Sequence, residues 1–181
     1  MGFRCVTNVF IVAAKRTAFG TFGGALKDYS ATELAVECSK AALAASGVPL
    51  EAVDNVIFGN VAQTSTDAPY LSRHAGLKAG LPQSAPALTL NRLCGSGFQA
   101  IVCGASDIHL GSSRVALVGG SESMSQAPYA ARGLRFGTTL GVNPQLEGTF
   151  YFNSFFFLTR LIFCNSFYFL YCGKKIPCGQ H

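Results

Sequence analysis

Short apolar runs alternate with longer segments of helical periodicity, and this alternation limits the possible folds more than any other feature. The apolar runs cover residues 8–14, 55–61, 87–90 and 114–120. The periodic segments lie between them and cover residues 30–46, 67–78 and 96–110. Strands that alternate with helices in this way pair in parallel through right-handed crossovers. The sequence therefore predicts an α/β fold with a mixed, mostly parallel sheet and flanking helices.

The first predicted helix has clear signals at both ends. Ser30 is followed three residues later by Glu33, which is the spacing of a capping box. Gly47 follows the last apolar position of the pattern and favours a left-handed C-terminal cap. Residues 30–46 are therefore the best delimited helix in the sequence.

The last 32 residues differ from the rest in composition. Residues 150–171 contain 11 aromatic side chains, against 10 in residues 1–149. We interpret residues 1–120 as the α/β domain, residues 121–149 as a loop-rich region and residues 150–181 as an irregular tail that is disordered or hydrophobic. T-rich non-coding nucleic acid would also encode a segment of this composition.

The tail is apolar enough to raise the question of a membrane span. Arg160 interrupts it, and an arginine in the middle of a bilayer costs about 3 kcal/mol on insertion scales. A true span is therefore disfavoured, whereas contact of the tail with a membrane stays open. Aggregation driven by this exposed apolar segment is a further alternative.

The charge pattern argues against nucleic acid as a partner. Residues 1–149 contain all 9 acidic side chains and 11 of the 14 basic ones, and the other three basic residues lie in the tail. The formal net charge of +5 does not therefore describe one basic face. Binding to nucleic acid is not expected.

The cysteines favour a reducing compartment. Seven of them are scattered along the chain, and their spacing forms no compact disulfide framework. The first acidic residue is Asp28, so the start of the chain has the basic, acid-poor bias of a mitochondrial targeting segment. A buried first strand explains the apolar part of the same region equally well.

Cys94 has the setting of a nucleophile. It stands between the predicted strand 87–90 and the predicted helix that begins near Ser96. A helix N-terminus favours the thiolate form of a cysteine placed there. Gly95 and Gly97 leave room for a substrate carbonyl beside the backbone. The alternative is an inert core residue, which is the usual role of a free cysteine and the one we expect for Cys38 and Cys103.

Other candidates have weaker support. His74 is expected on a helix surface or interface, and His109 falls about 20 Å along the helix axis from Cys94. Cys172, Cys178 and His181 supply only three metal ligands at an unusual spacing, so no metal site is expected. The glycines of residues 20–24 do not form a dinucleotide-binding motif.

Four stretches in family order resemble the thiolases, most closely the mitochondrial members that act on 3-ketoacyl-CoA. They are V-A-A-K-R-T-A-F-G, G-N-V-A-Q-T-S-T-D-A-P-Y-L-S-R-H-A-G-L, N-R-L-C-G-S-G-F-Q-A and V-G-G-S-E-S-M-S-Q-A-P-Y. The resemblance covers residues 6–148 and implies the N-terminal half of the thiolase fold.

The resemblance also implies a reaction. Cys94 would attack the 3-keto carbon of a 3-ketoacyl-CoA, release acetyl-CoA, and pass the shortened acyl group to a second coenzyme A, as in fatty acid β-oxidation. Coenzyme A would be a co-substrate, with no permanently bound cofactor. The family implies a homo-oligomer in the mitochondrial matrix, with the peroxisome and the cytosol as alternatives.

The motifs of the second thiolase half do not occur in this sequence. They are the asparagine of N-E-A-F, the histidine of G-H-P and the cysteine of C-x-G. We therefore expect the chain to be inactive alone, because the base and the proton donor of the reaction are absent. The alternative function is a non-catalytic chain that binds full-length thiolase subunits.

Overall fold

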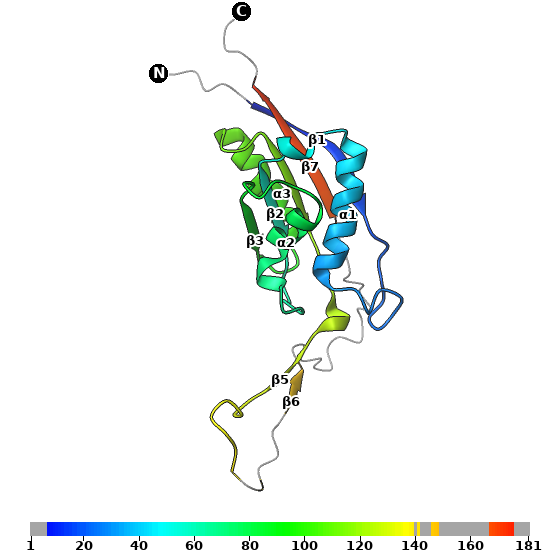
Figure 1. The fold of residues 1–181 in the computed structure, drawn as a ribbon, viewed down its shortest axis with the longest axis vertical. Coiled ribbons are helices and arrows are strands. Elements are labelled where there is room, and N and C mark those ends of the chain that lie inside the picture. Colours follow the sequence, from blue (N-terminus) through cyan, green and yellow to red (C-terminus); the bar gives the residue numbers. More distant parts are fainter. Residues whose placement is uncertain (1–6, 140, 142–145, 149–166, 176–181) are drawn as a thin grey trace, which may run out of the picture.

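The computed structural model describes residues 7–139, 141, 146–148 and 167–175, and its body is a five-stranded sheet between two layers of helices (Figure 1). The strand order is β1-β7-β4-β2-β3. The strands of this sheet are β1 (Thr7–Arg16), β2 (Asn55–Gly59), β3 (Ala87–Leu90), β4 (Val115–Gly120) and β7 (Phe167–Lys175). The helices are α1 (Ala31–Ser46), α2 (Leu71–Lys78) and α3 (Ser96–Leu110).

Strands β3, β2 and β4 form the parallel part of the sheet, which confirms the predicted α/β class. Ile57 in β2 pairs with Leu88 on one side and Val118 on the other. Every residue of β4 is buried, as expected for a strand covered on both faces. Alternate side chains of β2 and β4 supply two separate cores, one packed under α1 and α2 and the other under α3.

Helix α1 begins and ends where the sequence predicts. The Glu33 backbone N–H donates to Ser30 Oγ at 3.2 Å, and Glu33 Oε2 accepts from the Ser30 backbone N–H at 2.8 Å. Gly47 closes the helix with φ of 65°. The hydrogen bond from the Ser30 backbone N–H to the carboxylate, together with one from the Ser30 hydroxyl at 2.9 Å, holds the pKa of Glu33 below its ordinary value. Within the described residues, no helix combines the length and the apolar character that a membrane crossing requires.

Strand β7 shows that the prediction of an irregular tail is wrong for Phe167–Lys175. This strand lies between β1 and β4 and runs antiparallel to both, so that Thr7 pairs with Lys175 and Val115 with Cys172. Aromatic residues have high strand propensity, and a strand with a neighbour on each side can hydrogen-bond its backbone N–H and C=O groups within the sheet. Composition alone could not show that the sheet has an open position between β1 and β4. Residues 150–166 and 176–181 lie outside the described residues.

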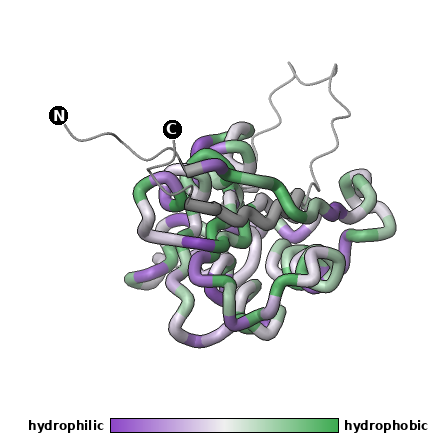
Figure 2. The backbone as a smooth tube through the Cα atoms, turned by 90° about the horizontal axis from the view of Figure 1, so that it is seen from above, coloured by the Kyte–Doolittle hydropathy of each residue, from purple (hydrophilic) through white to green (hydrophobic). Residues whose placement is uncertain are grey.

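A second, two-stranded sheet projects from the body (Figure 1). It pairs β5 (Tyr129–Ala131) with β6 (Leu146–Gly148). Three short 3₁₀ helices connect the larger elements, at Leu50–Ala52, Ala68–Tyr70 and Met124–Gln126. Figure 2 shows hydrophilic segments on several sides of the body rather than gathered on one face.

The start of α3 packs directly on the ends of β2 and β4, and glycines permit this. A side chain at Gly59 would place its Cβ 2.5 Å from the Ser96 carbonyl carbon and 2.8 Å from the Gly97 nitrogen. A Cβ at Gly120 would lie 3.0 Å from Gly97 Cα. Backbone therefore rests on backbone at this crossing, which fixes the height of α3 above the sheet.

We predict that Gly59→Ala lowers the free energy of unfolding by about 2 kcal/mol, because the added methyl group must push α3 off the sheet. Chemical denaturation followed by circular dichroism measures this. Gly95→Ala is the matched control, since its Cβ would lie 3.5 Å from the Arg92 carbonyl oxygen, an ordinary contact. Equal stability of the two variants would contradict the close packing.

We also predict that removal of residues 150–181 prevents folding, because β1 and β4 would both lose their antiparallel neighbour. Removal of residues 176–181 alone retains β7 and should leave the unfolding midpoint unchanged. Circular dichroism and gel filtration distinguish the two chains. A folded, soluble chain that ends at residue 149 would show that β7 is not required.

Candidate active site

Cys94 lies on the turn between β3 and α3, as the sequence predicts. Cys94 is exposed, whereas Cys38 is buried within α1 and Cys103 is half-buried in the middle of α3. Burial raises the pKa of the Cys38 thiol to about 11. The structure therefore confirms the expected core placement of Cys38. Among the three cysteines whose side chains are described, Cys94 alone is open to solvent.

The turn that presents Cys94 has an unusual backbone. Leu93 adopts φ of 51°, in the left-handed region that is unfavourable for a residue with a side chain. The Asn91 side chain compensates, since its Oδ1 accepts from the Leu93 backbone N–H at 2.9 Å. This left-handed residue reverses the chain immediately before Cys94.

Ser96 fixes the turn from the helix side. Its hydroxyl donates to the Leu93 carbonyl oxygen at 2.6 Å and accepts from the Arg92 backbone N–H at 2.8 Å. Gly95 is the N-cap of α3 and provides no side chain to cap the first-turn N–H groups. Cys94 is thus held one residue before a helix N-terminus, where partial positive charge favours the oxyanion of an acyl-transfer intermediate.

The residues after the three parallel strands converge at this edge of the sheet. The Asn60 backbone N–H donates to the Leu90 carbonyl oxygen, and the Ser121 backbone N–H donates to the Gly59 carbonyl oxygen, both at 3.0 Å. Asn60 and Glu122 lie in this group, and no motif in the sequence singled them out. The available signal was position, because parallel strands place the residues after their carboxyl ends together.

His74 lies away from Cys94. It belongs to α2, which covers one face of the sheet, whereas Cys94 precedes α3, which covers the opposite face. His74 Nδ1 lies 3.0 Å from Asp67 Oδ2, and the ring stacks on Tyr70. Partial burial raises the pKa of Asp67, but hydrogen bonds from His74 and Ser65 outweigh it and hold the value at about 2. The structure therefore gives His74 a local partner on the α2 side of the sheet.

The remaining candidates do not join Cys94 either. His109 lies in the last turn of α3, at the opposite end of the helix from Cys94. Across the described ranges, no three His, Cys, Asp or Glu residues gather as metal ligands. Cys178 and His181 lie outside those ranges.

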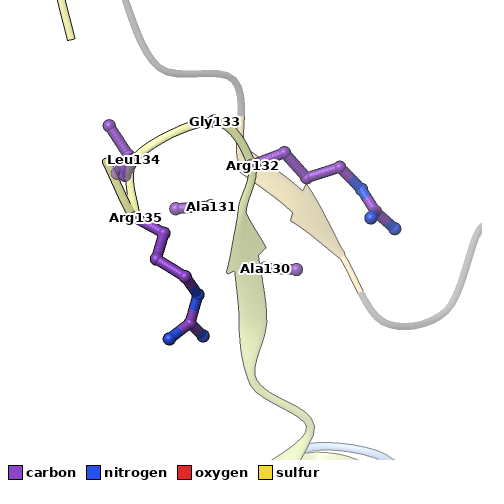
Figure 3. A pocket seen from close by; sticks show the side chains of 6 residues that line it. All are labelled: Ala130, Ala131, Arg132, Gly133, Leu134 and Arg135. Atoms are coloured by element: carbon purple, nitrogen blue, oxygen red, sulfur yellow. The ribbon is translucent and has the colours of Figure 1, made fainter. Parts of the chain in front are cut away.

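A shallow hollow lies at the end of β5 and is lined by residues 130–135 (Figure 3). Arg132 and Arg135 point away from each other there. Arg132 Nε donates to Glu147 Oε2 at 2.5 Å. The two guanidinium groups do not converge on one point, so this hollow is a weaker candidate site than the Cys94 turn.

Comparisons with known proteins agree with this geometry. Residues 9–155 match the model of the thiolase N-terminal domain. Human mitochondrial 3-ketoacyl-CoA thiolase is 59% identical over 140 residues, which are 77% of this chain and 35% of that protein. Its crystal structure in complex with CoA has a TM-score of 0.76 at 56% identity, covering 81% of this chain and 37% of that one.

A bacterial structure shows the same fold. The acetyl-CoA acetyltransferase of Bacillus anthracis has a TM-score of 0.74 at 42% identity and covers 81% of this chain and 36% of its own. The chain thus spans about a third of the length of the relatives it matches. The domain match and these similarities together show that the chain belongs to the thiolase family.

Proposed function

We propose that the chain carries the nucleophile of a thiolase-type acyltransferase and that Cys94 is this nucleophile. The observation that carries the proposal is the exposed Cys94 on a fixed turn before the N-terminus of α3. The family membership supports it, as does the solved relative that contains CoA. The substrate class is a 3-ketoacyl-CoA, with coenzyme A as co-substrate and no permanently bound cofactor.

The reaction divides into two transfers. The Cys94 thiolate forms a bond to the 3-keto carbon, the bond between C2 and C3 breaks, and the departing enolate of acetyl-CoA takes up a proton. The thiol of a second coenzyme A then gives up its proton, takes the acyl group, and the Cys94 thiolate is restored. A covalent intermediate replaces one difficult step by two easier ones.

The described residues provide the nucleophile but not the proton transfers. His74 lies on the other face of the sheet, and His109 lies at the far end of α3. The resemblance assigns the base and the proton donor to motifs that do not occur in this sequence. Turnover therefore requires those groups from a second thiolase half.

The names of the relatives suggest a setting for this function. The similar human protein is mitochondrial, so we propose mitochondrial localisation, in the matrix, with a role in fatty acid β-oxidation. We also propose that the chain associates with other thiolase subunits, in keeping with the oligomeric state that the resemblance implies.

A second candidate function is binding to thiolase subunits without catalysis. The observation that favours it is the outer face of α3, where Phe98 is 66% exposed and Val102 39% exposed, beside an exposed Leu93. An apolar face of this kind suits a protein partner. Co-purification with full-length subunits would support this function, and a chain that remains monomeric in their presence would exclude it.

We predict that iodoacetamide alkylates Cys94 at least about tenfold faster than Cys38, because burial lowers the thiolate population of Cys38 roughly a hundredfold at neutral pH. Cys94 should also react faster than the half-buried Cys103. Peptide mass spectrometry resolves the three sites. Equal rates at Cys94 and Cys103 would argue against an assembled nucleophile.

Thiolysis tests the completeness of the site. We expect no turnover of acetoacetyl-CoA or of a longer 3-ketoacyl-CoA by the chain alone, because the motifs to which the resemblance assigns proton transfer do not occur in this sequence. Cys94→Ser is the control for background reaction. Turnover that depends on Cys94 would contradict the need for a second half.

A further inference from the structure

The carboxylate of Glu122 joins the loop after β4 to the loop after β2. Its Oε2 accepts hydrogen bonds from the backbone N–H groups of Val61 at 2.8 Å and Ala62 at 3.1 Å. Its Oε1 accepts one from Asn60 Nδ2 at 3.2 Å. Charge-assisted hydrogen bonds of this kind are stronger than neutral ones. One side chain therefore fixes the path of the chain beyond β2.

Asn91 connects that loop to the Cys94 turn. Its Nδ2 donates to the Val61 carbonyl oxygen at 3.4 Å, and its Oδ1 accepts from the Leu93 backbone N–H at 2.9 Å. The peptide groups of Val61 thus contact Glu122 on one side and Asn91 on the other. A continuous series of hydrogen bonds leads from the Glu122 carboxylate to the residue that precedes Cys94.

The arrangement is maintained at an energetic cost. Asn60 is 1% exposed, and its Nδ2 donates both to Glu122 and to the Ser121 carbonyl oxygen. This orientation leaves Asn60 Oδ1 buried without a hydrogen-bond partner among the described residues. Leu93 is held in the left-handed region nearby. Unfavourable groups persist where the surrounding structure fixes them, and they gather at functional sites.

The surroundings of Glu122 make its role specific. Burial raises the pKa of Glu122, against the lowering effect of the N–H groups of Val61, Ala62 and Asn60. The carboxylate is therefore poorly solvated, and its hydrogen bonds to the loop after β2 take the place of water. A residue needed only for solubility would lie in water.

We propose that Glu122 is a positioning residue for Cys94. It orients the nucleophile through the Val61–Ala62 loop and Asn91, and it does not touch the substrate. The inference rests on the proposed role of Cys94 as nucleophile. The position of the turn after β3 would then depend on the loop after β4, which is a dependence that family membership alone does not imply.

The test compares Glu122→Ala and Glu122→Gln with a control, Glu37→Ala, whose side chain is 68% exposed on α1. The measured quantity is the rate of Cys94 alkylation by iodoacetamide in the full chain, relative to Cys103. We expect Glu122→Ala to lower the rate of Cys94 alkylation at least about threefold. Glu122→Gln should restore the rate to within about twofold, since its amide oxygen still accepts from the loop N–H groups. An unchanged ratio in Glu122→Ala overturns the inference.

Asn91→Asp tests the same connection without altering Glu122. It keeps the oxygen that accepts from Leu93 and removes the donor to Val61, so it should slow Cys94 as well. The double variant of Asn91→Asp and Glu122→Ala should show the same rate of Cys94 alkylation as Glu122→Ala alone, because both substitutions act on one connection. If Glu122→Ala fails to fold, an unchanged Cys94 rate in Asn91→Asp overturns the inference.

The outcomes separate this inference from the proposed function. If wild-type Cys94 reacts no faster than Cys103, the proposed function fails and the inference fails with it. If wild-type Cys94 reacts faster and Glu122→Ala leaves that advantage intact, only the positioning role of Glu122 fails. Additive effects in the double variant would likewise overturn the connection through Asn91.

Discussion

The contact of backbone with backbone between α3 and the sheet sets the geometry on which the site depends. Gly59 and Gly120 end adjacent parallel strands, and the first turn of α3 rests against both. Because no side chain separates these elements, the helix begins close to the strand ends. The Cys94 turn is then shaped by two hydrogen bonds of Leu93, whose backbone N–H donates to Asn91 Oδ1 and whose carbonyl oxygen accepts from the Ser96 hydroxyl.

The sheet beneath this contact is completed by a segment distant in sequence. Strand β7 fills the place between β1 and β4, so that β1 is joined to the sheet through β7. Two hydrophobic cores lie on the two faces of β2 and β4. Each core needs the sheet intact, and α3, which follows the Cys94 turn, packs on one of them. The integrity of the site is therefore tied to strand pairing far from Cys94.

Local chemistry in the sequence was sufficient for most of the elements. The Ser30 capping box and Gly47 delimit α1, and the segments before and after Cys94 match β3 and α3. Three features were not accessible in this way. β7 depends on a place that exists only once the other strands have paired. The Asn60 and Glu122 contacts join residues about 60 positions apart, and the left-handed Leu93 has no glycine to signal it.

The chain belongs to the thiolase family, and acylation of the exposed Cys94 tests most directly the proposal that this residue is the nucleophile. Transfer of an acetyl group from acetyl-CoA to a cysteine needs only a thiolate and the departure of the CoA thiolate, so it does not require the second thiolase half. After incubation of the full chain with acetyl-CoA, peptide mass spectrometry should find the thioester on Cys94 well before Cys38 or Cys103. Acetylation spread evenly over the three cysteines, or absent from Cys94, would contradict the account.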